Sequence, residues 1–97
     1  MYGTIAKLKA KPGAIKALKS MAAAESLKAR GAIASYVYQM DADPNEFYLA
    51  VAFESKEAYV TNAQSPEQHA SYEKMMEWLT AEPEWHDGQI VHTEQFQ

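Results

Sequence analysis

The stretch IASYVYQMDADPNEFYLAVAFE, residues Ile33–Glu54, decides the fold of this chain. Its first part, Ile33–Met40, and its last part, Glu46–Glu54, are rich in β-branched and aromatic residues, and each predicts a strand. Between them lies DADPN, residues 41–45, in which Asp, Pro and Asn all favour a turn. Two such strands joined by a short turn predict an antiparallel hairpin.

Both faces of this hairpin are apolar, whereas a sheet with one solvated face alternates apolar with polar residues. Alternate residues of the second strand form one apolar set, namely Phe47, Leu49, Val51 and Phe53. The residues between them are not polar either: Tyr48, Ala50 and Ala52. Two helices can cover only one face, so the other face would be an exposed apolar patch. We therefore expect a homodimer that packs sheet to sheet.

The segments before the hairpin predict a strand and a helix. Tyr2–Ala10 is compatible with a strand, which the Lys-Pro-Gly sequence at residues 11–13 ends. The region from Pro12 to about Arg30 is rich in Ala, Leu and Lys and predicts a helix. Gly31 is well placed to cap the end of that helix.

The segments after the hairpin predict two more helices and a final strand. Ser55 is expected to cap a short helix over KEAYVTNAQ, residues 56–64. The sequence Ser-Pro-Glu-Gln at residues 65–68 forms a capping box with proline at the first helical position, and that helix is expected to run to about Ala81. Gln89–Phe96 predicts the last strand. The order β-α-β-β-α-β is ferredoxin-like, an α+β fold with a four-stranded antiparallel sheet and both long helices on one face.

The composition narrows the class of protein. A chain of 97 residues is expected to form a single domain over residues 1–97. Its net charge of −4 argues against a nucleic-acid or anionic-membrane partner. The absence of cysteine excludes disulfides and cysteine-bound zinc. With no apolar run of about 20 residues and no signal-like start, we expect a cytoplasmic protein.

Five segments carry a resemblance to a known family. They are the opening strand followed by KPG, the hairpin, KEAY at residues 56–59, SPEQH at residues 65–69 and EPEWHDGQ at residues 82–89. With these segments the chain resembles the antibiotic biosynthesis monooxygenase-like (ABM) proteins of the dimeric α+β barrel superfamily. The resemblance implies dimers whose two sheets form a barrel. It also implies, for some members, oxidation of aromatic polyketides by molecular oxygen without a metal or prosthetic group.

The resemblance also bears on haem degradation and on the pocket. Haem-degrading members use an Asn on the first strand, and YGTIAKLKA has none, so haem degradation is not expected. The quinone-forming members use a pocket of Trp, Tyr, Asn and Arg side chains between helices and sheet. The resemblance gives Tyr36, Tyr72 and Trp78 as the corresponding substrate-binding residues, and we add Met76 from the same helix as Tyr72.

His69 is the candidate catalytic residue. On a helical wheel it shares a face with Tyr72 and Met76, which places it at the edge of the expected buried stripe. An imidazole with an unperturbed pKa of ~6.5 suits a base near neutral pH, and Glu73, four residues on, is placed to orient it. The alternative is a histidine that hydrogen-bonds a carbonyl at the edge of the core.

The first helix presents small residues along its inward face after Leu18, namely Ala22, Ser26 and Ala29. These residues either let the helix pack closely or leave a void for a ligand between helix and sheet. Trp85 is expected to be a structural residue in a loop, and His92 to lie on the last strand. No cofactor is expected because the chain has no glycine-rich phosphate loop, and no metal is expected because its three histidines form no ligand pair.

Together these features lead to two hypotheses. The first is a cofactor-independent monooxygenase that acts on an electron-rich aromatic, phenolic or polyketide-like small molecule, with His69 as the base or polar anchor. The second is a non-catalytic dimer that binds a small apolar metabolite or serves as a stress-response or assembly module.

Overall fold

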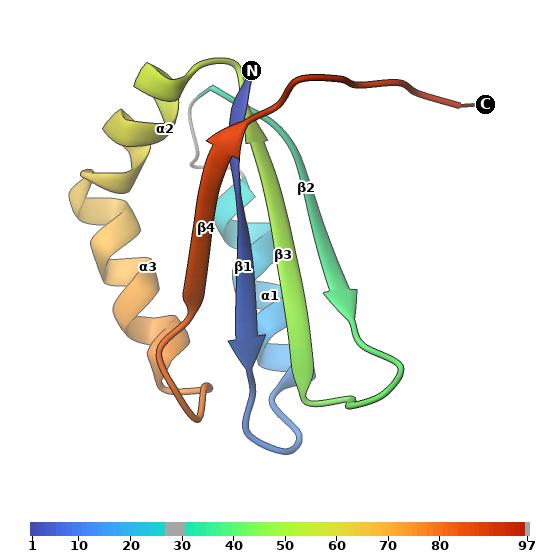
Figure 1. The fold of residues 1–97 in the computed structure, drawn as a ribbon. Coiled ribbons are helices and arrows are strands. Elements are labelled where there is room, and N and C mark those ends of the chain that lie inside the picture. The colour runs from blue at the N-terminus through green and yellow to red at the C-terminus, as the bar shows by residue number, and fades with distance from the viewer. Residues whose placement is uncertain (27–30, 97) are drawn as a thin grey trace.

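A computed structural model describes the backbone of residues 1–26 and 31–96, and the side chains of residues 1–20 and 31–96. Within these residues the chain forms a sheet and three helices, which all lie on one side of the sheet (Figure 1). The elements in chain order are β1 Tyr2–Lys9, α1 Ile15–Ser26, β2 Ala32–Gln39, β3 Glu46–Phe53, α2 Lys56–Ala63, α3 Pro66–Met76 and β4 Glu84–Gln89. The sheet is antiparallel with strand order β2-β3-β1-β4, so the predicted ferredoxin-like α+β fold is confirmed.

The predicted hairpin forms between β2 and β3, and local turn chemistry closes it. Tyr36 lies opposite Ala50 in the antiparallel register. In the turn, the backbone N–H of Asn45 donates to Asp43 Oδ1 at 3.0 Å, as an aspartate at the start of a turn commonly arranges. The N–H of Glu46 donates to the carbonyl of Asp43 at 2.9 Å and starts β3.

The core lies between the helices and the two central strands. Even-numbered residues of β1 face odd-numbered residues of β3 on the helix side, as in the pair Ala6 and Leu49. The buried cluster there consists of Ala6, Leu8, Ala10, Ala14, Phe47 and Leu79. Partly buried side chains from α1 and α3 pack against it, namely Ile15, Leu18, Met75 and Met76. No helix of the described residues covers the opposite face of the sheet, which we call the open face.

The predicted starts of α2 and α3 are confirmed by their caps. Ser55 Oγ accepts a hydrogen bond from the N–H of Ala58 at 3.0 Å, and Ser65 Oγ accepts one from the N–H of Gln68 at 3.1 Å. Each bond satisfies a backbone donor that the first turn of a helix leaves without an intrahelical partner.

The predicted end of α3 at Ala81 is wrong, because the helix ends at Met76. The segment that follows forms backbone hydrogen bonds with the end of β1 instead. Lys11 N–H donates to the carbonyl of Trp78 at 2.8 Å, and Thr80 N–H donates to the carbonyl of Lys9 at 2.9 Å. Backbone groups that bond to a neighbouring strand cannot also continue a helical ladder.

The predicted last strand at Gln89–Phe96 is also wrong, since β4 covers Glu84–Gln89. The pairing of β4 begins at Lys7, because Lys9 and Ala10 already bond to the segment after α3. The pairing ends where Gln89 lies opposite Tyr2, because Tyr2 is the first residue of β1. The following residues, including His92, lie outside any strand, and Val91 is 90% exposed.

The first helix begins at Ile15 rather than at the predicted Pro12. The predicted end near Arg30 lies outside the described residues. Gly31 has a φ of +79°, in the left-handed region that suits a glycine after a helix. Among the described residues, no helix is long and apolar enough to cross a membrane.

Candidate functional site

The five predicted site residues do not meet in one place. Tyr36 points from β2 onto the open face and is 61% exposed. Tyr72 and Met76 are half-buried on α3, on the other side of the sheet, and Met76 packs against the buried cluster. Trp78 follows the end of α3 and is exposed. Among the described residues, the sheet therefore separates Tyr36 from the four predicted site residues on and after α3.

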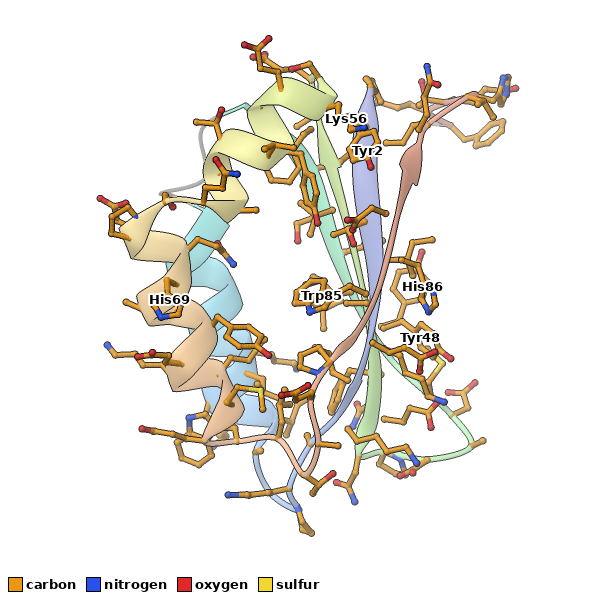
Figure 2. All side chains as sticks on the ribbon, turned by 60° about the vertical axis from the view of Figure 1, so that its left-hand side comes forward. Tyr2, Tyr48, Lys56, His69, Trp85 and His86 are labelled. Atoms are coloured by element: carbon orange, nitrogen blue, oxygen red, sulfur yellow. The ribbon has the colours of Figure 1, made fainter. Side chains whose placement is uncertain are left out.

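His69 is oriented differently from the prediction. Its side chain is 73% exposed, so the predicted position at the buried edge of the helix is wrong. The half-buried positions of α3 include Gln68, Tyr72 and Met75, and His69 lies one residue beyond that stripe. The predicted partner is present, because His69 Nε2 lies 3.0 Å from Glu73 Oε1. Figure 2 shows His69 on the outer helix layer.

A polar pair that sequence reasoning missed joins α2 to β4 on the helix side of the sheet. The Tyr59 hydroxyl donates to Asp87 Oδ1 at 2.8 Å. Burial, together with this hydrogen bond, raises the pKa of Tyr59 from 10.0 to about 12, although a hydrogen bond with Thr4 opposes the shift. The phenol therefore stays protonated over the physiological pH range and acts as a fixed donor.

Aromatic rings surround the Tyr59 phenol and hold it in position. The ring centroids of Tyr2 and Phe53 each lie 5.4 Å from that of Tyr59, within the range of favourable aromatic pairs. Lys56 Nζ lies 5.7 Å from the centroid of Tyr2 on the same side of the cluster. The hydroxyl of Tyr59 is thus carried by a ring with aromatic neighbours from two strands.

Trp85 lies beside this pair. It is two residues before Asp87 on β4, so both side chains point to the same face of the sheet. The register confirms which face this is, because Trp85 pairs with Ala6 and Asp87 with Thr4, both of which are buried under the helices. Figure 2 shows Trp85 on the helix side of the sheet and His86 on the opposite side.

The expectation that Trp85 belongs to a loop is wrong, because the segment EPEWHDG contributes most of β4. The sequence does contain one indication of the arrangement. If residues 85–87 form a strand, the indole of Trp85 and the carboxylate of Asp87 lie on one face and the imidazole of His86 lies on the other. Only the pairing with β1 reveals that these residues form a strand.

The open face carries a hollow of about 470 Å³. Small residues form much of its lining, including Gly3, Ala34, Ala50, Ala52 and Gly88. Larger side chains also contribute to its lining: Ile5, Tyr36, His86 and Ile90. Ile5 and Tyr36 are both more than half exposed, so apolar surface surrounds an apolar depression. The sequence prediction of a second apolar face is confirmed.

These features define a ferredoxin-like α+β domain with one sheet face covered by helices and the other bare. The family model of the antibiotic biosynthesis monooxygenases matches residues 1–74, and the chain belongs to this family. The match ends within α3, before β4 with Trp85 and Asp87 begins.

Solved structures show the same fold. A Chloroflexus aurantiacus J-10-fl protein, described as a candidate antibiotic biosynthesis monooxygenase, is 22% identical, with a TM-score of 0.81 over 97% of this chain and 96% of that chain. Rv0793 from Mycobacterium tuberculosis is 18% identical, with a TM-score of 0.77 over 97% of this chain and 98% of its own. A conserved Methanosarcina mazei Go1 protein is 20% identical, with a TM-score of 0.78 over 91% and 90% of the two chains. No curated protein matches the chain.

Proposed function

We propose that the protein is a monooxygenase that oxidises an electron-rich aromatic small molecule, phenolic or polyketide-like, without a cofactor. Membership of the antibiotic biosynthesis monooxygenase family supports the monooxygenase role. The observation that carries the substrate class is the indole of Trp85, which is 40% exposed on the helix side of the sheet, next to the hydrogen-bonded Tyr59–Asp87 pair. An exposed indole beside fixed polar groups suits a flat ring that bears hydroxyls.

The proposed reaction needs only the substrate, a base and molecular oxygen. The phenolic O–H bond breaks as the proton passes to the base, and the phenolate transfers one electron to oxygen. The resulting aryloxyl radical and superoxide combine at a ring carbon that bears hydrogen, which forms a C–O bond and gives a hydroperoxide once the proton returns. Loss of water then leaves a quinone, so one oxygen atom enters the product and the other leaves as water. The protein contributes a shaped site in which the Asp87 carboxylate is placed to accept the phenolic proton.

Tyr72 and Met76, half-buried on α3, are proposed as further lining residues on this side of the sheet. His69 is the base that the sequence predicts. Its exposed position works against that role, because solvent competes for the substrate proton and weakens every electrostatic interaction around it. The comparison of Trp85→Ala with His69→Ala therefore locates the site.

The experiment is oxygen uptake by the purified protein with a panel of dihydroxyaromatics. We expect protein-dependent uptake that Trp85→Ala lowers at least about tenfold, as loss of a large apolar contact would, while His69→Ala stays within about twofold of the unchanged protein. If no compound of the panel gives protein-dependent uptake, the proposed reaction is wrong.

We also propose that a second copy of the chain covers the open face. Ile5, Tyr36 and Tyr38 are all more than half exposed there, and contiguous apolar surface of this kind marks an interaction site. Light scattering after gel filtration at micromolar concentration should give twice the chain mass of 10.9 kDa. A mass of one chain would contradict this proposal without affecting the reaction.

A non-catalytic function is supported by the hollow on the open face. Its lining is mostly small and apolar, and a depression of about 470 Å³ suits a small apolar metabolite. In this alternative the dimer binds such a molecule or serves as a stress-response or assembly module. Binding of an apolar probe that Ala50→Phe abolishes, without any oxygen uptake, would favour this alternative.

A further inference from the structure

We propose that Trp85 and Asp87, with Tyr59 behind them, form a binding site for a hydroxylated aromatic ring on the helix side of β4. The ring packs on the indole of Trp85, and a ring hydroxyl donates to the carboxylate of Asp87. This inference rests on the proposed function for its substrate class, but it concerns binding and does not require turnover.

The geometry of β4 sets the spacing of the two contacts. Successive residues on one face of a strand lie about 6.6 Å apart, since each residue advances the chain by about 3.3 Å. Trp85 and Asp87 are such a pair on the helix side. A phenol spans a comparable distance from its ring to the atom that accepts its hydroxyl proton. One flat ring can therefore contact the indole and reach the carboxylate at once.

The indole of Trp85 lacks the cover that residues on this face normally have. Among the described residues, α2 reaches the edge strand β4 through the hydrogen bond between Tyr59 and Asp87. The residue beside Trp85 on β1 is Ala6, whose methyl group covers little of a large ring. Trp85 thus remains 40% exposed although it faces the helix layer. Apolar surface on the covered side of a sheet that the described side chains leave exposed is a place for a ligand.

The carboxylate of Asp87 is oriented by the hydroxyl of Tyr59. Tyr59 donates to its Oδ1 at 2.8 Å, which fixes one oxygen and directs the other. Over the residues whose side chains are described, no basic group forms an ion pair with Asp87. A carboxylate in this state accepts a strong, charge-assisted hydrogen bond from a hydroxyl.

Tyr59 is suited to this positioning role because it donates and does not ionise. Burial raises its pKa to about 12, so its hydroxyl keeps its proton at any pH at which a substrate would bind. It also stays in place through its contacts with the rings of Tyr2 and Phe53. The alternative role of the Tyr59–Asp87 hydrogen bond is purely structural: it acts as a clamp that joins α2 to β4. A clamp alone predicts no preference for hydroxylated ligands.

The test measures selectivity for a hydroxyl under anaerobic conditions. In a Trp78→Phe background the chain keeps one indole, that of Trp85, because it has two tryptophans. The indole N–H resonance of ¹⁵N-labelled protein is followed during titration with 1-naphthol and with 1-methoxynaphthalene. The methyl ether has the same rings but no hydroxyl to donate. We expect 1-naphthol to bind at least about tenfold more tightly, as a hydrogen bond to a charged group would give.

Two variants on β4 form a matched pair. Asp87→Asn keeps an oxygen for Tyr59 but presents an amide N–H₂ to the ligand, so the preference for 1-naphthol should fall to within about twofold. Glu84→Gln removes the same charge from the same strand on the open face, and should leave the preference intact. Tyr59→Phe should reduce the preference a few-fold while the thermal unfolding transition stays cooperative.

The inference is overturned if 1-naphthol and its methyl ether bind equally, if neither shifts the Trp85 resonance, or if Asp87→Asn keeps the preference. Should Asp87→Asn not fold, the two probes on the Trp78→Phe protein decide alone. The outcomes also separate this inference from the proposed function. Selective binding without oxygen uptake contradicts only the reaction, and uptake without hydroxyl selectivity contradicts only the site at Trp85 and Asp87.

Discussion

Replacement of Tyr59 by Phe should change the pH dependence of stability. The phenol has a pKa of about 12 in the folded chain, above the usual 10.0, because burial and the bond to Asp87 favour the protonated form. A group whose pKa is raised on folding stabilises the fold fully below the unfolded pKa. That stabilisation is lost as the pH rises through the folded pKa. The window for Tyr59 is therefore pH 10 to 12.

The size of the effect follows from the shift. The difference between a pKa of 10.0 and one of about 12 corresponds to an upper limit of ~2.7 kcal/mol in the free energy of unfolding. Tyr59 is only half-buried, so solvent screening reduces the expected change in unfolding free energy to roughly 1 kcal/mol. At pH 8, Tyr59→Phe should be less stable than the unchanged chain by about 1 kcal/mol, the value of one hydrogen bond. Near pH 12 that difference should vanish.

The assay is urea unfolding at pH 8 and near pH 12 at one protein concentration, because assembly makes stability depend on concentration. Tyr72→Phe is the matched control: it removes a half-buried phenol from α3, on the same side of the sheet, and its effect should stay within about 0.5 kcal/mol at both pH values. If Tyr59→Phe destabilises the chain equally at pH 8 and pH 12, the reasoning about this phenol is wrong.

Three further substitutions test the fold and the open face. Ser65→Ala should lower the unfolding free energy by about 1 kcal/mol in urea titrations, because it removes the N-cap of α3. Gly3→Ala should unfold at markedly lower urea than Gly88→Ala, because a Cβ at Gly3 would lie 2.3 Å from the backbone oxygen of Val51, whereas a Cβ at Gly88 meets nothing within 4 Å. Ile5→Lys should convert the proposed dimer to a monomer in light scattering while circular dichroism stays unchanged, since a charge would be buried at the interface.

The hairpin and the starts of α2 and α3 could be predicted because each depends on local interactions. The turn at residues 41–45 contains residues whose side chains bond the turn backbone, and Asp43 does so. Ser55 and Ser65 sit before the first turns that they cap. Each of these features depends on residues a few positions apart, so the sequence alone contains the whole interaction.

Long-range pairing is what made the last strand unpredictable. The segment after Gln89 is more strand-like by composition than EWHDGQ, which contains Asp and Gly. The position of the last strand is determined by its pairing with β1. At one end, Lys9 and Ala10 already bond to the segment after α3, and at the other end β1 begins at Tyr2. Pairing partners can override β-propensity in this way, because the ladder must start and stop where the neighbouring strand does.

The candidate site could not be predicted from the sequence because it also depends on how distant elements pack. A helical wheel gives the angles between residues of one helix, but not the rotation of the helix against the sheet, and His69 lies just outside the inward stripe of α3. Tyr59 and Asp87 are 28 positions apart, on a helix and a strand that only the fold brings together. Moreover, Trp85 is expected from the sequence to lie in a loop, and without a strand the alternation that orients Asp87 is not available.

The alternation of β4 allows its two proposed roles to be separated within six residues. Trp85 and Asp87 face the helices, whereas His86 and Gly88 face the hollow on the open face. A bulky substitution at Gly88 should therefore weaken assembly in light scattering without changing the hydroxyl preference of the bound probe. Asp87→Asn should abolish that preference without changing the assembled mass. If both substitutions alter both measurements, the two faces of β4 are coupled, and the ligand site depends on the second copy.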